Sequence, residues 1–138
     1  MEVSKVCEEV KLTYKPKVKA SERPKVKCSQ DIYQLLKEHV FDEETIEYRE
    51  TLKVILMNCG GHVLGFHTIS AGGTTECCAD VRVILQVALL TNANGIILTH
   101  NHPSGNAYPS HNDDFLTEKV RKCCQLMDIK FLDHLIVT

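Results

Sequence analysis

Two closely spaced histidines could bind a metal ion. His100 and His102 are separated by one residue and lie just past an apolar segment, Ile96-Ile97-Leu98, which is typical of a short buried strand. In an extended chain, residues i and i+2 point to the same side. Both imidazoles are therefore expected to converge at the end of this strand, where each can offer a neutral ring nitrogen to a metal.

Asp113 is expected to complete this group of ligands. Pro103 and Gly105 predict a sharp turn after the histidines, and Ser110 has the type and position of a helix N-cap. Asp113 then falls in the first turn of that helix and can face back toward the histidines. Two imidazoles and one carboxylate leave the fourth position of a tetrahedral zinc ion to water, as in catalytic zinc sites. The sequence therefore predicts one zinc ion per chain.

Hydrolysis at such a site also needs a general base, and Glu50 is the preferred candidate. It alternates with the apolar residues of the strand predicted over residues 50–57, so it should share their face of the sheet. Glu47 and Glu76 are rival bases. The Ser110 hydroxyl could donate to a developing oxyanion, although a plain helix cap is the alternative role for this residue.

Other polar residues near the motif are given structural roles. Ser104 is interpreted as a turn residue, and His111 as an exposed residue of the first helical turn. His134 and Asp133 on the last predicted strand form a structural pair in this interpretation, with support of a metal ligand as the alternative for His134. Cys77–Cys78 are interpreted as inert thiols.

The surrounding pattern predicts a single α/β domain with a central mixed β-sheet flanked by helices. Strands are expected over residues 50–57, 63–69, 96–98 and 130–138, and the first two should form a hairpin around Asn58–Gly61. Helices are expected over residues 30–40 with Ser29 as N-cap, over 81–91, and from Ser110 to about Met127. The last helix should bury Phe115, Leu116, Val120, Cys123, Cys124 and Met127.

Composition narrows the class of protein. The chain has 138 residues and a net charge of −2, with seven cysteines but no Cys-x-x-Cys pair. An odd cysteine count without an export signal favours reduced thiols over a disulfide framework or a cysteine-based zinc finger. No apolar segment approaches the length of about 18 residues that a membrane span requires. We therefore expect a cytoplasmic protein without a membrane segment.

Residues 1–28 are expected to form a basic N-terminal arm. Between Lys11 and Lys27, seven basic residues stand against Glu22 alone, a charge of +6 that leaves −8 for the remainder. Val10–Tyr14 alternates apolar and polar residues, as an edge strand or an extended arm would. Such an arm could contact nucleic acid or an acidic partner, and the alternative is a solvated edge guarded by lysines.

The metal-ligand pattern resembles a known signature. The order His100-x-His102-Pro103 followed by Ser110-x-x-Asp113 matches the His-x-His-x7-Ser-x-x-Asp motif of the JAMM (JAB/MPN) metalloproteases. Within this family, the chain is most similar to the bacterial RadC branch, which also has a glutamate at the start of a strand like that of Glu50. The segments that carry this similarity are His100-Asn101-His102-Pro103-Ser104-Gly105, Pro109-Ser110, Val87-Ala88, Ile97-Leu98 and Asp133-His134-Leu135-Ile136-Val137.

The resemblance covers about residues 29–138 and implies a JAB/MPN, cytidine-deaminase-like architecture. It implies that His100, His102 and Asp113 bind zinc, that Glu50 activates water, and that Ser110 supports the transition state. The implied activity is that of a peptidase or isopeptidase acting on a peptide or protein. Long RadC proteins carry a helix-hairpin-helix region, and the 28 residues before Ser29 are too few for one.

Two alternatives to an enzyme remain at this stage. The first is a binding module associated with DNA repair or mobile elements, in which the zinc is structural and the basic arm meets nucleic acid. The second is a scaffold that keeps the fold without turnover, against which the intact ligand set argues.

Overall fold

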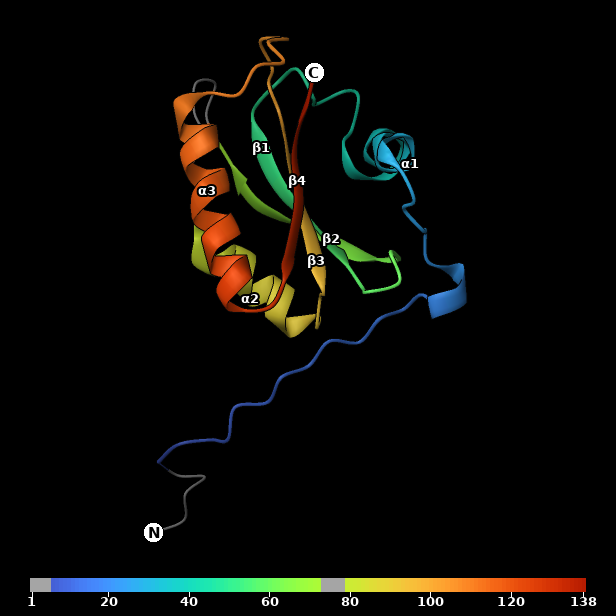
Figure 1. The fold of residues 1–138 in the computed structure, drawn as a ribbon, viewed down its shortest axis with the longest axis vertical. Coiled ribbons are helices and arrows are strands. Elements are labelled where there is room, and N and C mark those ends of the chain that lie inside the picture. Colours follow the sequence, from blue (N-terminus) through green and yellow to red (C-terminus); the bar gives the residue numbers. More distant parts are fainter. Residues whose placement is uncertain (1–5, 73–78) are drawn as a thin grey trace.

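The computed structural model describes residues 6–72 and 79–138, which form a mixed sheet with helices on both faces (Figure 1). The strands occur in the order β2-β1-β3-β4, with β1 antiparallel to both β2 and β3, and β3 parallel to β4. Their bounds are Thr51–Met57 for β1, Val63–Ala71 for β2, Gly95–Asn101 for β3 and Lys130–Val137 for β4. The predicted α/β domain with a mixed sheet is confirmed.

Helices α2 and α3 cover one face of the sheet, and α1 covers the other (Figure 1). Their bounds are Ser29–Leu35 for α1, Val81–Leu90 for α2 and His111–Leu126 for α3, with a π-helical turn η3 at Leu36–Val40 and a short 3-10 helix η2 at Ala20–Glu22. Burial of apolar side chains on both faces of the sheet produces this layered arrangement.

The central strand β1 shows the alternation that separates the two faces. Leu52, Val54 and Leu56 pack in the cluster shared with α2 and α3, whereas Ile55 and Met57 pack in the cluster shared with α1. Successive residues of a strand point to opposite faces. An even-numbered residue at the start of this strand is therefore directed toward the α3 side, where the site lies.

The strand register places the start of β1 beside the end of β3. Leu52 pairs with His100 in the antiparallel β1–β3 ladder. Glu50 immediately precedes β1, and His102 immediately follows β3, so both emerge at the same end of the sheet. In the parallel β3–β4 ladder, Leu98 pairs with His134. Three segments that are distant in the sequence therefore meet at this end.

Helix α1 begins and ends differently from its prediction. Cys28 is the N-cap and makes no side-chain cap bond, while Ser29 is already helical, so the predicted cap at Ser29 is wrong. The Asp31 carboxylate accepts a hydrogen bond from the Lys27 backbone N–H at 2.8 Å and stabilises this end instead. At the other end, the Phe41 N–H reaches the Leu36 carbonyl at 2.9 Å, which widens the last turn into a π-turn.

The basic arm is extended, and the edge-strand alternative is wrong for its described part. Residues 7–16 have no regular secondary structure, and Val10 and Leu12 are each 83% exposed. The Tyr14 hydroxyl donates to the Leu64 carbonyl at 3.0 Å, and a single isolated bridge joins Lys25 to His62. A ladder needs repeated backbone pairing, which one bridge does not provide. The division at residue 28 stays a prediction.

Helix α3 buries fewer side chains than its apolar residues predicted. Val120 and Cys124 are fully buried, but Phe115 is 73% exposed and Met127 is 46% exposed, so the inward positions predicted for these two residues are wrong. Phe115 lies five residues before Val120, which corresponds to about 140° around the helix axis. Met127 is the C-cap, where the chain leaves the helix. Apolar type alone therefore misassigned both residues.

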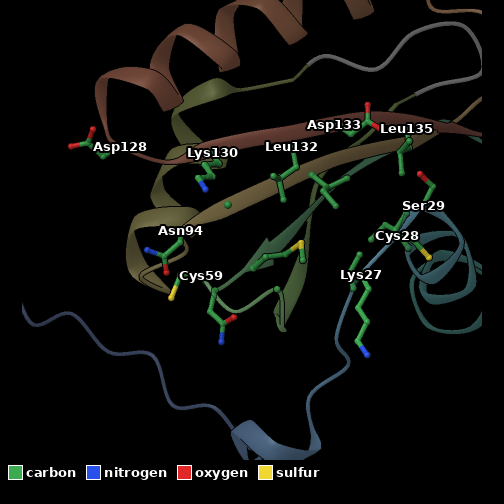
Figure 2. A pocket seen from close by; sticks show the side chains of 17 residues that line it. Lys27, Cys28, Ser29, Cys59, Asn94, Asp128, Lys130, Leu132, Asp133 and Leu135 are labelled. Atoms are coloured by element: carbon green, nitrogen blue, oxygen red, sulfur yellow. The ribbon is translucent and has the colours of Figure 1, made fainter.

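A cavity of about 490 Å³ opens at the far end of the sheet, between the start of α1, the β1–β2 turn and the beginning of β4 (Figure 2). Its lining includes Cys59, Asn94, Lys130 and Leu132, and none of the predicted site residues. Within the described ranges, no helix is both long enough and apolar enough to cross a membrane.

The burial difference along α3 predicts unequal effects of truncation. Val120→Ala should lower the free energy of unfolding by roughly 1–3 kcal/mol, because it removes buried methyl groups and leaves a cavity. Phe115→Ala, although it removes more atoms, should cost less than about 1 kcal/mol. Urea unfolding followed by circular dichroism measures both, and a larger loss for Phe115→Ala would contradict this account of α3.

Candidate metal centre

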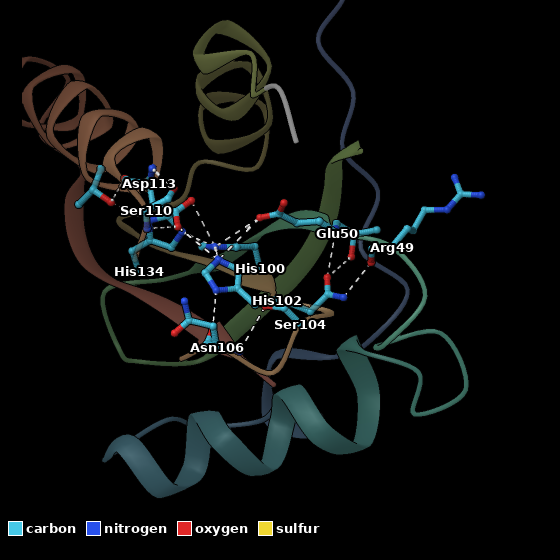
Figure 3. A network of polar contacts seen from close by, with 12 residues as sticks. Arg49, Glu50, His100, His102, Ser104, Asn106, Ser110, Asp113 and His134 are labelled. Carbon is cyan, nitrogen blue, oxygen red and sulfur yellow. Dashed lines mark hydrogen bonds and ion pairs between the residues drawn. The ribbon is translucent and has the colours of Figure 1, made fainter. Parts of the chain in front are cut away.

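Four side chains with metal-ligating atoms converge at the end of the sheet where β3 ends. They are Glu50, His100, His102 and Asp113, and one ligand atom from each lies within 4.8 Å of all the others. The two Nε2 atoms of the histidines are 2.7 Å apart. Figure 3 shows the two imidazoles between the Asp113 and Glu50 carboxylates. The residues predicted to form the site are therefore adjacent in space, while their individual roles stay predictions.

The tautomer of His102 follows from its backbone partner. Its Nδ1 lies 2.6 Å from the Asn106 carbonyl oxygen, which can only accept, so Nδ1 carries the proton. The lone pair of Nε2 is thereby directed toward the cluster. Gly105, at φ 81°, makes the turn between these two residues, and its N–H donates to the His102 carbonyl at 3.0 Å. This left-handed conformation favours glycine.

Ser110 and Asp113 form a capping box at the start of α3. The Ser110 Oγ accepts from the Asp113 N–H at 3.1 Å, and Asp113 Oδ2 accepts from the Ser110 N–H at 2.8 Å. These bonds hold the carboxylate so that Oδ1 is 3.3 Å from His100 Nε2 and Oδ2 is 3.3 Å from His102 Nε2. The predicted N-cap at Ser110 is confirmed.

Electrostatics keep the aspartate charged and the buried histidine neutral. Burial raises the pKa of Asp113, but the Ser110 backbone N–H and the nearby His100 outweigh it, so the net pKa is lowered. Burial lowers the pKa of His100 more than the Asp113 charge raises it. A carboxylate and a neutral imidazole are the forms that bind metals.

Glu50 lies beside the other three groups. Its Oε1 is 3.6 Å from His100 Nε2 and 3.8 Å from His102 Nε2, and its side chain is 14% exposed. These distances exceed those between Asp113 and the histidines, which leaves Glu50 at the margin of the cluster. The rival base Glu47 is exposed and absent from the cluster, and the rival Glu76 lies outside the described residues.

Asn101 positions Glu50, a role that the sequence analysis did not foresee. Its side chain is 1% exposed. Its Oδ1 accepts from the Thr51 N–H at 2.8 Å and from the Thr51 hydroxyl at 3.0 Å. Its Nδ2 donates to the carbonyls of Ile46 and Arg49. The residue between the two histidines therefore ties the chain on both sides of Glu50 to the end of β3.

The other polar residues near the motif make local contacts or are exposed. Ser104 accepts from the Asn106 N–H at 3.3 Å, as a turn residue would, and His111 is exposed at the first position of α3. Asp133 accepts the His134 backbone N–H at 2.8 Å, which agrees with a structural pair. Burial, followed by the repulsion that a protonated His100 would exert, lowers the pKa of His134 to about 4. Cys77–Cys78 lie outside the described residues.

The donor set fits a metal ion such as zinc. Ligand atoms about 2.0–2.1 Å from one ion, at tetrahedral angles, lie about 3.3–3.4 Å apart. Asp113 Oδ1 lies 3.3 Å from His100 Nε2 and Oδ2 lies 3.3 Å from His102 Nε2, both at this value, whereas the two Nε2 atoms, 2.7 Å apart, are closer and must separate by about 0.6 Å around an ion. A cavity of about 390 Å³, lined in part by His100, Asp113 and His134, adjoins these residues on the α3 side.

The fold and the clustered side chains together define a small α/β domain with a possible metal site at one end of its sheet. A family model described as the RadC-like JAB domain matches residues 26–138. The chain belongs to the RadC-like JAB-domain family, part of a superfamily of the metallohydrolase type. The resemblance inferred from the His-x-His…Asp pattern and from Glu50 is confirmed.

The buried amide of Asn101 predicts a large loss of stability on truncation. Asn101→Ala should lower the free energy of unfolding by about 2–5 kcal/mol, since it leaves buried backbone groups without partners. Asn106→Ala, in the exposed loop nearby, should change it by less than about 1 kcal/mol because water replaces the lost bond. Denaturant unfolding measures the free energy of unfolding of both variants. Equal decreases would show that the Asn101 side chain does not hold the segment before β1 in place.

Proposed function

We propose that this chain is a zinc-dependent hydrolase of the JAMM type that cleaves the amide bond of a peptide or isopeptide. The single observation that carries the proposal is the convergence of Glu50, His100, His102 and Asp113 within 4.8 Å. Membership in the RadC-like JAB family supports it. Two histidines and one carboxylate form a ligand set typical of catalytic zinc.

The ligand roles are assigned to His100, His102 and Asp113. When bound, zinc would supply Lewis-acid polarisation and would lower the pKa of a water molecule. The Ser110 cap holds the Asp113 carboxylate toward the histidines, and the Asn106 carbonyl holds the His102 ring. These contacts keep the ligand atoms oriented before any ion arrives, which reduces the reorganisation that binding requires.

Glu50 is assigned the role of general base. Its carboxylate lies at the margin of the cluster, beside both histidine nitrogens. As water attacks the carbonyl carbon, Glu50 takes the water proton and delivers it to the amide nitrogen when the C–N bond breaks. The Asn101 clamp keeps Glu50 within reach of the reacting atoms.

Ser110 is assigned the stabilisation of the developing oxyanion. Its Oγ uses a lone pair to accept the Asp113 N–H. Capping therefore does not consume the hydroxyl proton, which can be donated to a carbonyl oxygen as negative charge develops on it.

Separate readouts of metal content and turnover test this assignment. Purified protein should contain about one zinc per chain by mass spectrometry of the metal. Glu50→Gln should keep that zinc but reduce kcat/KM on a peptide and isopeptide library by at least about 100-fold, the usual contribution of a general base. Asp113→Ala should lose both metal and activity.

His111→Ala provides the matched control, because His111 is two residues from Asp113 but exposed and outside the cluster. It should retain full zinc content and full activity. The hydrolase proposal fails if the wild-type protein, fully loaded with zinc, cleaves no member of the library.

A second candidate function is nucleic-acid binding through the basic arm. The lysines Lys11, Lys15, Lys17 and Lys19 are all exposed on an extended segment, which suits contact with phosphates. In this alternative the zinc is structural.

Phosphate contacts make a specific prediction for salt. Binding to duplex DNA should weaken steeply between about 50 and 200 mM salt, because each neutralised phosphate releases a counterion. Replacing the four lysines by glutamine should flatten that dependence in a fluorescence anisotropy titration. Absence of binding by the wild-type chain at low salt would remove this candidate.

A further inference from the structure

His134 on β4 is the partner of the buried metal-ligand candidate His100. His134 Nε2 lies 2.7 Å from His100 Nδ1, and the Thr117 Oγ1 of α3 lies 2.6 Å from His134 Nδ1. Figure 3 shows His134 on the Asp113 side of His100. The His134 nitrogen that faces the centre is thus occupied by His100 Nδ1, which places His134 behind the ligand cluster rather than in it.

The hydrogen bonds from His100 through His134 and Thr117 to Asp113 determine which ring nitrogens carry protons. For His100 Nε2 to offer a lone pair, the ring proton must sit on Nδ1, which then donates to His134 Nε2. His134 Nε2 must therefore be unprotonated, and the His134 proton sits on Nδ1 and donates to Thr117 Oγ1. Thr117 has one hydroxyl proton, which it donates to the Asp113 carbonyl at 2.8 Å.

Each donor in this series of hydrogen bonds has one acceptor. The direction of the last bond, from Thr117 to the Asp113 carbonyl, determines the direction of the two bonds before it. The end point is a backbone carbonyl, which can only accept, so the direction cannot be reversed while Thr117 keeps that bond. The end point also belongs to Asp113, a second ligand candidate. The contacts therefore join His100 to the first turn of α3 through β4.

We propose that His134 is a positioning residue that, together with Thr117, holds His100 in the tautomer that presents Nε2 to a metal ion. The inference rests on the metal site of the proposed function but not on hydrolysis. Outer partners of metal-bound histidines orient the ring and raise its basicity, and their loss typically weakens metal binding about 10–100-fold.

The two histidine ligands differ in this respect. His102 donates its Nδ1 proton to the backbone carbonyl of Asn106, a partner that side-chain substitution does not remove. His100 depends on a side chain, which the parallel pairing of β3 with β4 brings beside it. Substitution of His134 therefore tests one ligand while the other stays supported.

The first measurement is zinc affinity, from competition with a chromogenic chelator. His134→Ala should weaken zinc binding about 10–100-fold relative to the wild type. His134→Gln keeps an acceptor oxygen near the position of Nε2 and should restore most of the affinity. The control is Asp133→Asn, which alters the neighbouring residue. The Asp133 Oδ1 accepts the His134 backbone N–H, a bond that the amide oxygen of asparagine can also accept, so this variant should bind zinc as the wild type does.

A second pair of variants tests the Thr117 hydroxyl, which accepts from His134 Nδ1. Thr117→Val removes the hydroxyl at nearly constant volume and should weaken zinc binding by up to about tenfold. Thr117→Ser keeps the hydroxyl and should stay close to wild type. This pair decides the question if His134→Ala does not fold, as judged by circular dichroism.

The third measurement determines which ring nitrogen of each histidine is protonated. Long-range ¹H–¹⁵N correlation spectra of the zinc-loaded protein should show His100 and His134 both protonated at Nδ1 and unprotonated at Nε2. Protonation of His134 at Nε2 would overturn the inference, as would unchanged zinc affinity in folded His134→Ala or in Thr117→Val. Failure of the wild type to bind zinc would overturn this inference and the proposed function together, whereas tight binding without hydrolysis would leave this inference supported.

Discussion

The hydrogen bonds of the Asn101 side chain are the contacts on which the geometry of the site depends. Both polar ends of this buried amide are satisfied by the segment that surrounds Glu50. That segment precedes β1 and is otherwise largely exposed. Without the amide, the backbone before β1 would lose its attachment to β3, because buried polar groups without partners are unfavourable. The β1–β3 pairing brings Asn101 beside this segment, and the Asn101 hydrogen bonds then fix the position of Glu50.

Around this contact, the chain surrounds a cluster of ionisable groups with specific partners. The Asp113 carboxylate accepts a backbone N–H, and His102 donates to a backbone carbonyl. Such partners orient the side chains before a ligand binds, so less conformational freedom is lost on binding. The larger cavity at the opposite end of the sheet has no comparable convergence of ligating side chains among its described lining residues. Chemistry rather than cavity size therefore identifies the site.

The parts of the site that sequence analysis predicted depend on local spacing. His100 and His102 converge because they bracket the end of a strand, and Asp113 faces them because Ser110 caps the next helix. The mixed sheet followed from alternating strand and helix patterns, and Glu50 was located by the two-residue period of β1. Each of these signals lies within one element or one turn.

The parts that sequence analysis missed, such as the role of Asn101, or left open, such as the partner of His134, depend on contacts between distant segments. The role of Asn101 requires the β1–β3 register, and the contact of His134 with His100 requires the parallel pairing of β3 with β4. Neither register is encoded by a local pattern. Val10–Tyr14 has the alternation of a strand but lies outside the sheet. Strand formation depends on a partner as well as on propensity.

The division of the site between two segments affects how it responds to local unfolding. The three proposed ligands belong to the continuous stretch from residue 100 to 113, whereas Glu50 belongs to a separate connector with several exposed neighbours. Proteins open in parts, and weakly packed segments open at the lowest free energy. Opening of the connector alone would yield a molecule in which the three proposed ligands stay together and Glu50 is displaced from them. The free energy of that opening would then set the fraction of molecules in which the four side chains are together.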